Sequence, residues 1–223
     1  MDITIVTLFP EMFTGPFDHS IIERAVEKQQ VTISYVAIRD FADDSYKTVD
    51  DHPYGGGHGM ILRVDVVDRA ITHAKQNKAS HVVLLDPQGV PYTESHAVKL
   101  SAYNHLILVC GHYEGIDERI RSLVDEEISI GDYVLTGGEL PAMIILDSVV
   151  RLLPGVLKKE QATSDESFSS PDHVLEYPQY TRPEIYKSMK VPPVLLSGNH
   201  KNIAGWKKSE ARLRTRLRRP DLV

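Results

Sequence analysis

The sequence predicts an α/β protein, with a parallel β-sheet covered by helices on both faces, a linker, and a small helical C-terminal domain. Short β-branched apolar runs alternate with segments of helical character through the first two thirds of the chain. These runs are apolar without polar alternation, which is typical of strands buried on both faces. Beyond residue 155 this rhythm stops, and a polar stretch precedes a basic helical segment near the end.

The first elements expected are a strand, a helix and a second strand. Residues 3–8, ITIVTL, are rich in β-branched side chains and end at a Phe-Pro pair, which predicts a buried strand followed by a turn. Ser20 is expected to cap a helix over residues 21–29, with Glu23 completing a capping box. Residues 31–38 are predicted to form the second strand.

The segment from residue 39 to residue 63 is polar and rich in turn-forming residues, and it is longer than a usual structural connection. Its centre, YGGGHGM, fits neither GxxxxGK[ST] nor a GxGxxG that follows a strand, so it gives little support for a nucleotide-binding motif. Two interpretations stay open. One is a flexible surface loop, and the other is a loop that wraps a phosphate backbone or acts as a lid. His58 has no metal-ligand partner at a recognisable spacing.

The middle of the chain repeats the strand and helix rhythm of a parallel sheet. The expected elements are a helix over 64–77, a strand over 81–86 with a turn at 87–89, a helix over 93–103, a strand over 105–110, and a helix over 140–153 that ends at Pro154-Gly155.

Three glycine-bearing turns punctuate the stretch from Cys110 to Arg151. Each follows a short apolar run, at Gly111, at Gly131 and at Gly137-Gly138. Glycine lets a ligand approach the main chain closely, and ligands of open α/β sheets bind at the carboxyl ends of strands. These turns therefore predict a pocket lined by backbone. Cys110 is the single cysteine, so it forms no internal disulfide, and we expect a small buried hydrophobe.

Composition limits the class of protein. The net charge is −6, no apolar run reaches the roughly 18 residues of a membrane span, and Asp2 stands where a secretory signal carries positive charge. We therefore expect a soluble cytoplasmic protein with no membrane partner. The predicted division is an α/β domain over 1–155, a flexible linker over 156–180 and a helical domain over 181–223.

The C-terminal helix, expected from Asn199 to about Leu217, is strongly basic within an acidic protein. We expect Trp206 and Leu213 to face inward and the arginines to face outward, where they favour contact with a polyanion. The candidate RNA-binding residues are Lys207, Lys208, Arg212, Arg214, Arg218 and Arg219.

Seven segments together resemble one family across nearly the whole chain. They are TLFPEMF, TVDDHPYGGGHGM, CGHYEGIDER, SIGDYVLTGGELPAM, RLLPGVL, YPQYTRP and VPPVLLSGNH. The chain is similar to the bacterial tRNA (guanine-N1)-methyltransferases of the TrmD type, in the SPOUT superfamily. The resemblance implies a homodimer whose α/β domain contains a deep trefoil knot, an exception to the rule that chains do not thread loops. It implies S-adenosylmethionine bound in the knot, tRNA and not DNA as the partner, and an active site between subunits.

The implied reaction is methylation of N1 of guanosine 37, beside the tRNA anticodon, when a guanosine precedes it. The resemblance carries the cofactor site over to residues of the glycine-bearing turns and the strands before them. They are Leu85, Pro87, Gly89, Gly111, Tyr113, Glu114, Ser129, Ile130, Gly131, Asp132, Tyr133, Val134, Leu135, Gly137 and Gly138. Glu114 is expected to neighbour the cationic end of the cofactor.

The implied catalytic residues are an arginine and a carboxylate. Because N1 of guanine carries a proton, a general base should remove it while an arginine stabilises negative charge on O6. The arginine matches Arg151. The family has an aspartate in a DSF motif where this chain has Glu166 by ungapped counting, with Asp165 as the adjacent alternative. The following segment, SSPDHVLEYP, is also one residue longer than in the family.

Two other functions stay open. The glutamate at the position of the base leaves room for an RNA-binding family member with impaired catalysis. The glycine turns alone allow a nucleotide-binding α/β enzyme of other chemistry. The family also implies Mg²⁺ dependence, although no metal-ligand spacing in the sequence identifies a site.

Overall fold

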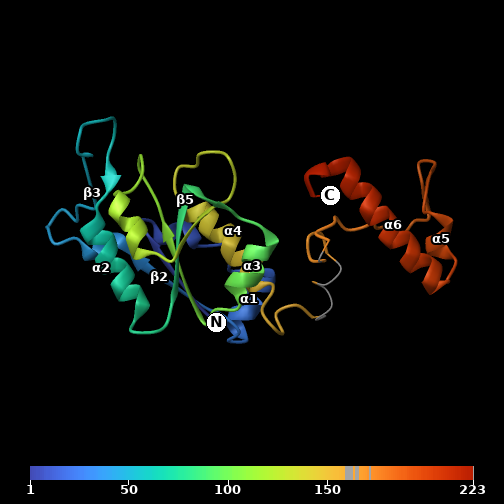
Figure 1. Ribbon diagram of the computed structural model, residues 1–223. Coiled ribbons are helices and arrows are strands. Elements are labelled where there is room, and N and C mark those ends of the chain that lie inside the picture. Colours follow the sequence, from blue (N-terminus) through green and yellow to red (C-terminus); the bar gives the residue numbers. More distant parts are fainter. Residues whose placement is uncertain (159–162, 164–165, 171, 223) are drawn as a thin grey trace. The chain divides into compact units, whose positions relative to one another are not determined.

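A computed structural model describes residues 1–158, 163, 166–170 and 172–222 (Figure 1). The chain forms two compact units, Met1–Lys158 and Lys159–Val223, and each is described by itself. The predicted three-part division stays a prediction, since part of its linker, including Asp165, lies outside the described residues.

The first unit is built on a five-stranded sheet in which every neighbouring pair is parallel, with the order β2-β1-β6-β5-β7. The predicted parallel sheet is therefore confirmed. Its strands are β1 (Asp2–Thr7), β2 (Thr32–Ala37), β5 (His81–Pro91), β6 (His105–Cys110) and β7 (Glu126–Ser129).

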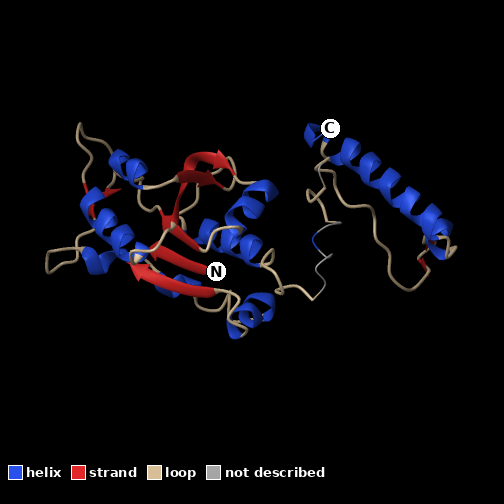
Figure 2. Ribbon diagram, turned by 60° about the horizontal axis from the view of Figure 1, so that its bottom comes forward, coloured by secondary structure: helices blue, strands red, loops and turns tan. Residues whose placement is uncertain are grey.

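Helices cover both faces of the sheet, as Figures 1 and 2 show. One face packs against α1 (Ser20–Glu27), α3 (Glu94–Ser101) and α4 (Glu139–Val150). The other packs against α2 (Val64–Lys75) and the 3₁₀ helices η2 (Ile38–Phe41) and η3 (Glu118–Leu123). Successive side chains of a strand point to opposite faces, so Leu108 enters the first core and Val109 the second. Both faces need apolar residues, which explains the unbroken apolar runs.

The helix starting near Ser20 is present, but the predicted capping box is wrong. His19 occupies the N-cap position without a side-chain cap, and Ser20 is the first helical residue with a φ of +66°. Asp18, the nearest preceding carboxylate, instead accepts a hydrogen bond from the Gly15 N–H at 2.9 Å in the turn before the helix.

The glycine-rich segment forms a short hairpin from β3 (Asp50–Asp51) and β4 (Ile61–Leu62). Its returning arm is fixed to a second loop: the Glu114 N–H donates to the Met60 carbonyl at 3.2 Å, and the Leu62 N–H donates to the Gly115 carbonyl at 3.1 Å. The tip around Gly55 and Gly56 is open, because a β-carbon on either glycine would have no atom within 4 Å.

The strand expected to end at residue 86 continues to Pro91, and residues 87–89, where a turn was predicted, lie within an irregular part of this strand. The pairing of β5 with β7 shifts register between Leu85 and Val90, which makes this segment an irregularity within the strand. Here β5 passes very close to the backbone of β7. Gly89 permits this approach, because a β-carbon there would lie 2.5 Å from the Ile128 backbone nitrogen.

The second unit contains a hairpin that the sequence did not predict, followed by two helices. The hairpin pairs β8 (Ile185–Tyr186) with β9 (Met189–Lys190), and the helices are α5 (Pro193–Leu196) and α6 (His200–Arg218), with η5 (Pro220–Leu222) after them. The two turn residues of the hairpin have positive φ without being glycine, so the usual sequence signal for a tight hairpin is missing. Asn199 caps α6 by accepting a hydrogen bond from the Asn202 N–H at 3.2 Å.

The inward face of α6 differs from the predicted one. Leu213 is 50% exposed, whereas Ala211 and Thr215, four residues apart, are buried. The hydroxyl of Thr215 accepts a hydrogen bond from the Leu175 N–H at 2.9 Å. An extended backbone segment packs on this side and needs a small, polar partner, so the larger leucine faces away. No described helix is both long enough and apolar enough to cross a membrane.

Candidate active site

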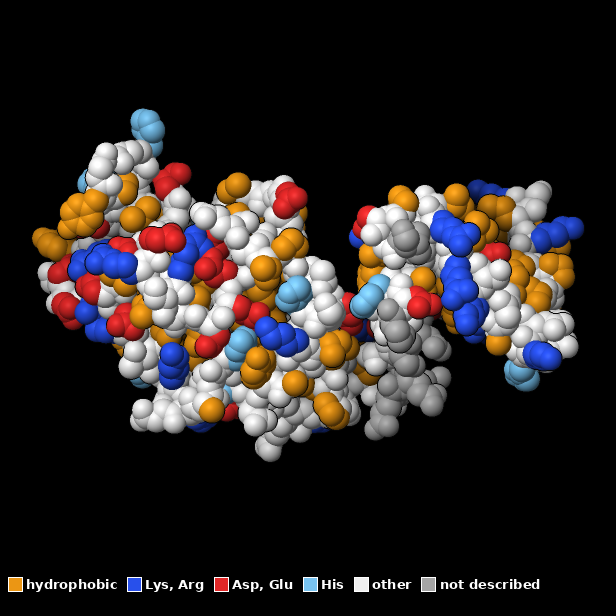
Figure 3. Space-filling view, viewed as in Figure 1, with side chains coloured by type: hydrophobic (Ala, Val, Ile, Leu, Met, Phe, Trp, Pro, Cys, Tyr) orange, Lys and Arg blue, Asp and Glu red, His pale blue; other side chains and the backbone are white. Residues whose placement is uncertain are grey.

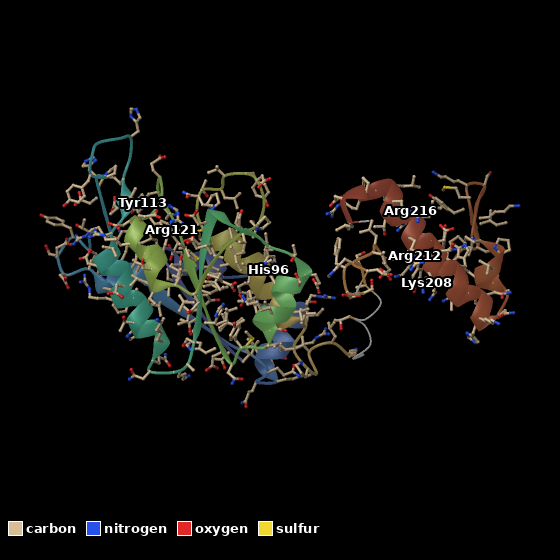
Figure 4. The ribbon with its side chains drawn as sticks, viewed as in Figure 1. His96, Tyr113, Arg121, Lys208, Arg212 and Arg216 are labelled. Atoms are coloured by element: carbon tan, nitrogen blue, oxygen red, sulfur yellow. The ribbon has the colours of Figure 1, made fainter. Side chains whose placement is uncertain are left out.

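The first unit contains a cavity of about 350 Å³ where the carboxyl ends of β5, β6 and β7 meet the loop before α4. This is the sheet edge at which parallel α/β proteins bind ligands. Of the residues predicted to hold the cofactor, all except Gly89 and Asp132 line it: Leu85, Pro87, Gly111, Tyr113, Glu114, Ser129, Ile130, Gly131, Tyr133, Val134, Leu135, Gly137 and Gly138. Figure 4 labels Tyr113 among them.

Two of the glycines let separate chain segments meet at backbone distance. The Gly138 N–H donates to the Gly111 carbonyl at 2.8 Å, and a β-carbon on Gly138 would lie 2.6 Å from the Cys110 α-carbon. A β-carbon on Gly111 would lie 3.2 Å from the Leu85 carbonyl oxygen. The ends of β5 and β6 and the start of α4 therefore form one wall, and any larger residue there would push them apart.

The loop over residues 130–138 forms the other wall. Gly131 has a φ of +152°, a conformation that suits glycine, and its N–H donates to the Ser129 hydroxyl at 3.3 Å. Beyond it, Val134 is 84% exposed although it is apolar. The loop thus presents apolar side chains to the cavity and to solvent.

Charge at the cavity is mainly negative. Asp86, Glu114 and Glu118 line it together with one cation, Arg121 (Figure 4). Arg121 donates to Glu118 at 2.9 Å and to Glu127, and its guanidinium lies 3.5 Å from Asp86. Because this arginine is already shared among carboxylates, the surrounding field favours a cationic ligand over an anionic one.

Sequence reasoning missed part of the lining. It overlooked residues adjacent in sequence to the predicted cofactor residues. It also overlooked the returning arm of the β3-β4 hairpin, which reaches the cavity through backbone hydrogen bonds to the loop at residues 114–115. The missed residues are Ile61, Asp86, Gln88, His112, Gly115, Ile116, Glu118, Arg121, Ile128, Thr136 and Pro141. His112 lies between Gly111 and Tyr113, which were both predicted to hold the cofactor. Its position between them in the sequence could have identified it.

Cys110 is fully buried, as expected. Burial, reinforced by the nearby Glu139 carboxylate, raises the pKa of its thiol well above the usual value. A protonated, enclosed thiol is a poor nucleophile, so Cys110 acts as a small hydrophobe.

The catalytic candidates divide between the units. Arg151 ends α4 in the first unit, where its N–H donates to the Asp147 carbonyl at 3.2 Å, and it is not among the described residues that line the cavity. Glu166 belongs to the second unit, is half-buried, and accepts hydrogen bonds through its carbonyl from Ser169. Asp165 lies outside the described residues.

Three cations of the basic helix α6 lie along one groove. Lys208, Arg212 and Arg216, spaced four residues apart, line a groove of about 480 Å³ with Gly205, Ser209 and Leu213 (Figure 4). Figure 3 shows the basic side chains gathered over the second unit. Arg216 was not among the predicted RNA-binding residues, although it continues the same helical spacing.

The other predicted cations of this unit have varied surroundings. Lys207 lies over the Tyr177 ring at 4.3 Å, and the guanidinium of Arg219 pairs with Asp221 at 2.6 Å. Arg214 is half-buried and Arg218 is exposed. Among the described residues no group of three or more His, Cys, Asp or Glu side chains is placed to hold a metal ion.

Comparison with known proteins gives one consistent result. The sequence profile of the family described as "tRNA (Guanine-1)-methyltransferase TrmD" matches residues 1–223. A tRNA (guanine-N(1)-)-methyltransferase from Syntrophomonas wolfei is 54% identical over 223 residues, which are 100% of this chain and 90% of that protein. The protein of the same name from Geobacillus kaustophilus is 55% identical over 225 residues, covering 100% of this chain and 91% of that one. That from Dictyoglomus turgidum is 52% identical over 221 residues, covering 99% and 89%.

Proposed function

The chain belongs to the TrmD family of tRNA (guanine-1)-methyltransferases, and from this premise we propose that it methylates N1 of guanosine 37 in tRNA with S-adenosylmethionine as the methyl donor. The observation that carries the proposal is the cavity at the ends of β5, β6 and β7, in a chain that matches the family over its whole length.

The cavity fits the cofactor in size, surface and charge. Its volume of about 350 Å³ lies in the range of roughly 300–1,000 Å³ that small-molecule sites occupy. Leu85, Ile128 and Pro141 give apolar cover for an adenine ring, while the glycine turns offer backbone groups to its edge. The carboxylates around the cavity suit the positive sulfonium that supplies the methyl group.

The trefoil knot implied by the family belongs to this proposal. It is supported by the close crossings at Gly89 and Gly138, where separate segments meet with no room for a side chain. Segments that pass this close together are compatible with a chain threaded through its own loop.

In the proposed reaction, Glu166 accepts the N1 proton of guanine and Arg151 stabilises the charge that develops on O6. Asp165 is the alternative base. A glutamate places its carboxylate one methylene further from the backbone than the family's aspartate, so the base keeps its chemistry but changes its reach. Replacing Glu166 by alanine and, separately, Asp165 by alanine identifies which of them carries the proton.

The proposed homodimer is supported by the surface of α4. This helix is apolar on nearly every side, yet Leu140 and Ile144, four residues apart, are 48% and 47% exposed. A helix that is apolar all round is normally buried. A second copy of the chain covering this stripe would remove both side chains from water.

The tRNA is proposed to bind the α6 groove through its phosphates. Lysine and arginine side chains contact the backbone of nucleic acids without reading sequence, and such binding weakens with salt. We also carry over from the family the dependence on Mg²⁺ and the site of action in the cytoplasm.

The test is product formation by the purified protein with S-adenosylmethionine and a tRNA transcript bearing GG at positions 36 and 37. We expect N1-methylguanosine in the digested RNA, measured by mass spectrometry. A transcript with adenosine at position 37 is the matched control and should yield none.

The alternative function, an RNA-binding family member with impaired catalysis, rests on the glutamate at position 166. It predicts tRNA binding and cofactor binding without turnover. Finding both bound and no N1-methylguanosine would favour it over the enzyme.

A further inference from the structure

A buried carboxylate lies beside the cavity without an assigned role. Glu139, in the first turn of α4, is 1% exposed. Its Oε1 accepts a hydrogen bond from the hydroxyl of Thr7, at the end of β1, at 2.7 Å. Thr7 is itself fully buried and accepts the Phe9 N–H at 3.0 Å. Burying a carboxylate is costly unless its oxygens are bonded, and here only Oε1 has a close hydrogen-bond donor among the described residues.

The second oxygen faces a histidine of the cavity wall. The Oε2 atom of Glu139 lies 3.9 Å from Nδ1 of His112, and this Nδ1 is buried with no hydrogen-bond partner among the described residues. Gly137 leaves the space between them, because a β-carbon on Gly137 would collide with both atoms. His112 and Gly137 also pair through their backbones as an isolated β-bridge.

The ring of His112 is held on other sides by aromatic contacts. Its centroid lies 5.0 Å from that of Phe9 and 5.2 Å from that of Tyr113. An acceptor oxygen opposite a buried ring nitrogen favours the tautomer with the proton on Nδ1. A hydrogen bond needs about 2.7–3.2 Å between the heavy atoms. The observed separation of 3.9 Å is too long for one, but a small rotation of either side chain would close the gap.

We propose that Glu139 is a positioning residue for the cofactor site, which accepts a hydrogen bond from Nδ1–H of His112 when the cavity is filled. The bond ties the Gly111-His112 turn to the start of α4, and through Thr7 it anchors both to β1. The Gly111 turn and the Gly137-Gly138 turn, which meet in one wall of the cavity, are then held at one separation. This inference rests on the proposed function, since it takes S-adenosylmethionine as the occupant of the cavity.

A simpler role for Glu139 is a negative charge at a helix N-terminus, where it interacts favourably with the helix dipole. Glu94 holds the same place in the first turn of α3, and it is not among the described residues that line the cavity. Glu94→Gln is therefore the matched control, because it removes a first-turn charge without touching the Thr7, Glu139 and His112 chain.

Glu139→Gln gives the sharpest test. The glutamine carbonyl can still accept from Thr7, but its amide faces Nδ1 with a donor, so His112 must move its proton to Nε2. Nuclear magnetic resonance of protein labelled with ¹⁵N-histidine reports the tautomer directly, and His112→Asn assigns the signal. With S-adenosylhomocysteine bound, we expect the Nδ1–H tautomer in the unaltered protein and in Glu94→Gln, and the Nε2–H tautomer in Glu139→Gln.

Calorimetry with S-adenosylhomocysteine supplies the second readout. We expect Glu139→Gln to raise its Kd about tenfold, as for loss of a hydrogen bond to a charged group, while Glu94→Gln leaves it unchanged. Thr7→Ser keeps the donor and should bind normally, whereas Thr7→Val should weaken binding.

The outcomes separate the two proposals. Failure of the unaltered protein to bind S-adenosylhomocysteine would overturn the proposed cofactor site. Binding by the unaltered protein, with the same tautomer and the same Kd in Glu139→Gln, would overturn the positioning role even if that variant were less stable.

Discussion

Gly138 offers a direct test of how the cavity wall is built. Its φ of −80° is open to any residue, so Gly138→Ala introduces a steric effect without backbone strain. The added methyl group would lie 2.6 Å from the Cys110 α-carbon and 2.8 Å from the Gly111 nitrogen. Both neighbours are backbone atoms, so the two segments must separate to accommodate it.

The cost follows from these contacts. Overpacking of this kind costs about 1–3 kcal/mol, and the lower entropy of the unfolded alanine chain returns about 0.4–1 kcal/mol. We expect a net loss of about 1–2 kcal/mol in the free energy of unfolding, or a fall in Tm of roughly 2–8 °C for a protein of this size. Separation of the turns should also raise the Kd for S-adenosylmethionine about tenfold or more, which is a loss of about 1.4 kcal/mol.

Thermal unfolding and calorimetry measure the two effects. Gly205→Ala is the control, because Gly205 lies within α6 with nothing within 4 Å of its side-chain position. That variant should keep or raise the Tm and leave cofactor affinity unchanged. Unchanged Tm and unchanged affinity in Gly138→Ala would refute the account of this crossing.

Three further predictions concern the other surfaces. Replacing Lys208 and Arg216 by alanine should reduce the slope of log K for tRNA against log salt by about 2, as for two lost phosphate contacts; an unchanged slope, measured by filter binding, would place the RNA elsewhere. If the proposed dimer forms through α4, Ile144→Asp should convert it to a monomer in light scattering, because it puts a charge into the apolar stripe of this helix; a dimer of unchanged mass would exclude this interface. Burial raises the pKa of Glu126, but its bonds to Lys99 and to a histidine outweigh this and lower the pKa overall. Its stabilising effect is therefore fully present above the unfolded pKa and lost as pH falls through the lower folded-state pKa, so Glu126→Gln should lower Tm at pH 7 more than at pH 3; an equal difference at both would contradict the pairing.

The sheet and most helices could be predicted because their signals are local. Strands such as β6 are apolar at every position, since both faces are buried, and no neighbouring segment is needed to recognise them. The hairpin at 185–190 could not be predicted, because its turn uses Lys187 and Ser188 at positive φ rather than glycine. The orientation of Leu213 depended on which segment packs against α6, and the sequence around the helix does not reveal that partner.

The candidate site divides in the same way. The glycine turns predicted a backbone-lined pocket, and the family resemblance selected residues that line the cavity. Glu139 and His112 escaped notice, because the burial of one carboxylate depends on Thr7 from β1 meeting the start of α4. Such a contact joins residues 132 positions apart, and no spacing along the chain predicts it.

The central claim is that this protein places a methyl group on N1 of guanosine 37. A methyl group at N1 blocks base pairing, so reverse transcription of the reacted tRNA should stop beside position 37 only when both the protein and S-adenosylmethionine are present. The account predicts this stop with the GG transcript and full-length copying when position 37 is adenosine. Full-length copying of the GG transcript after reaction, or a stop at any other position, would contradict it.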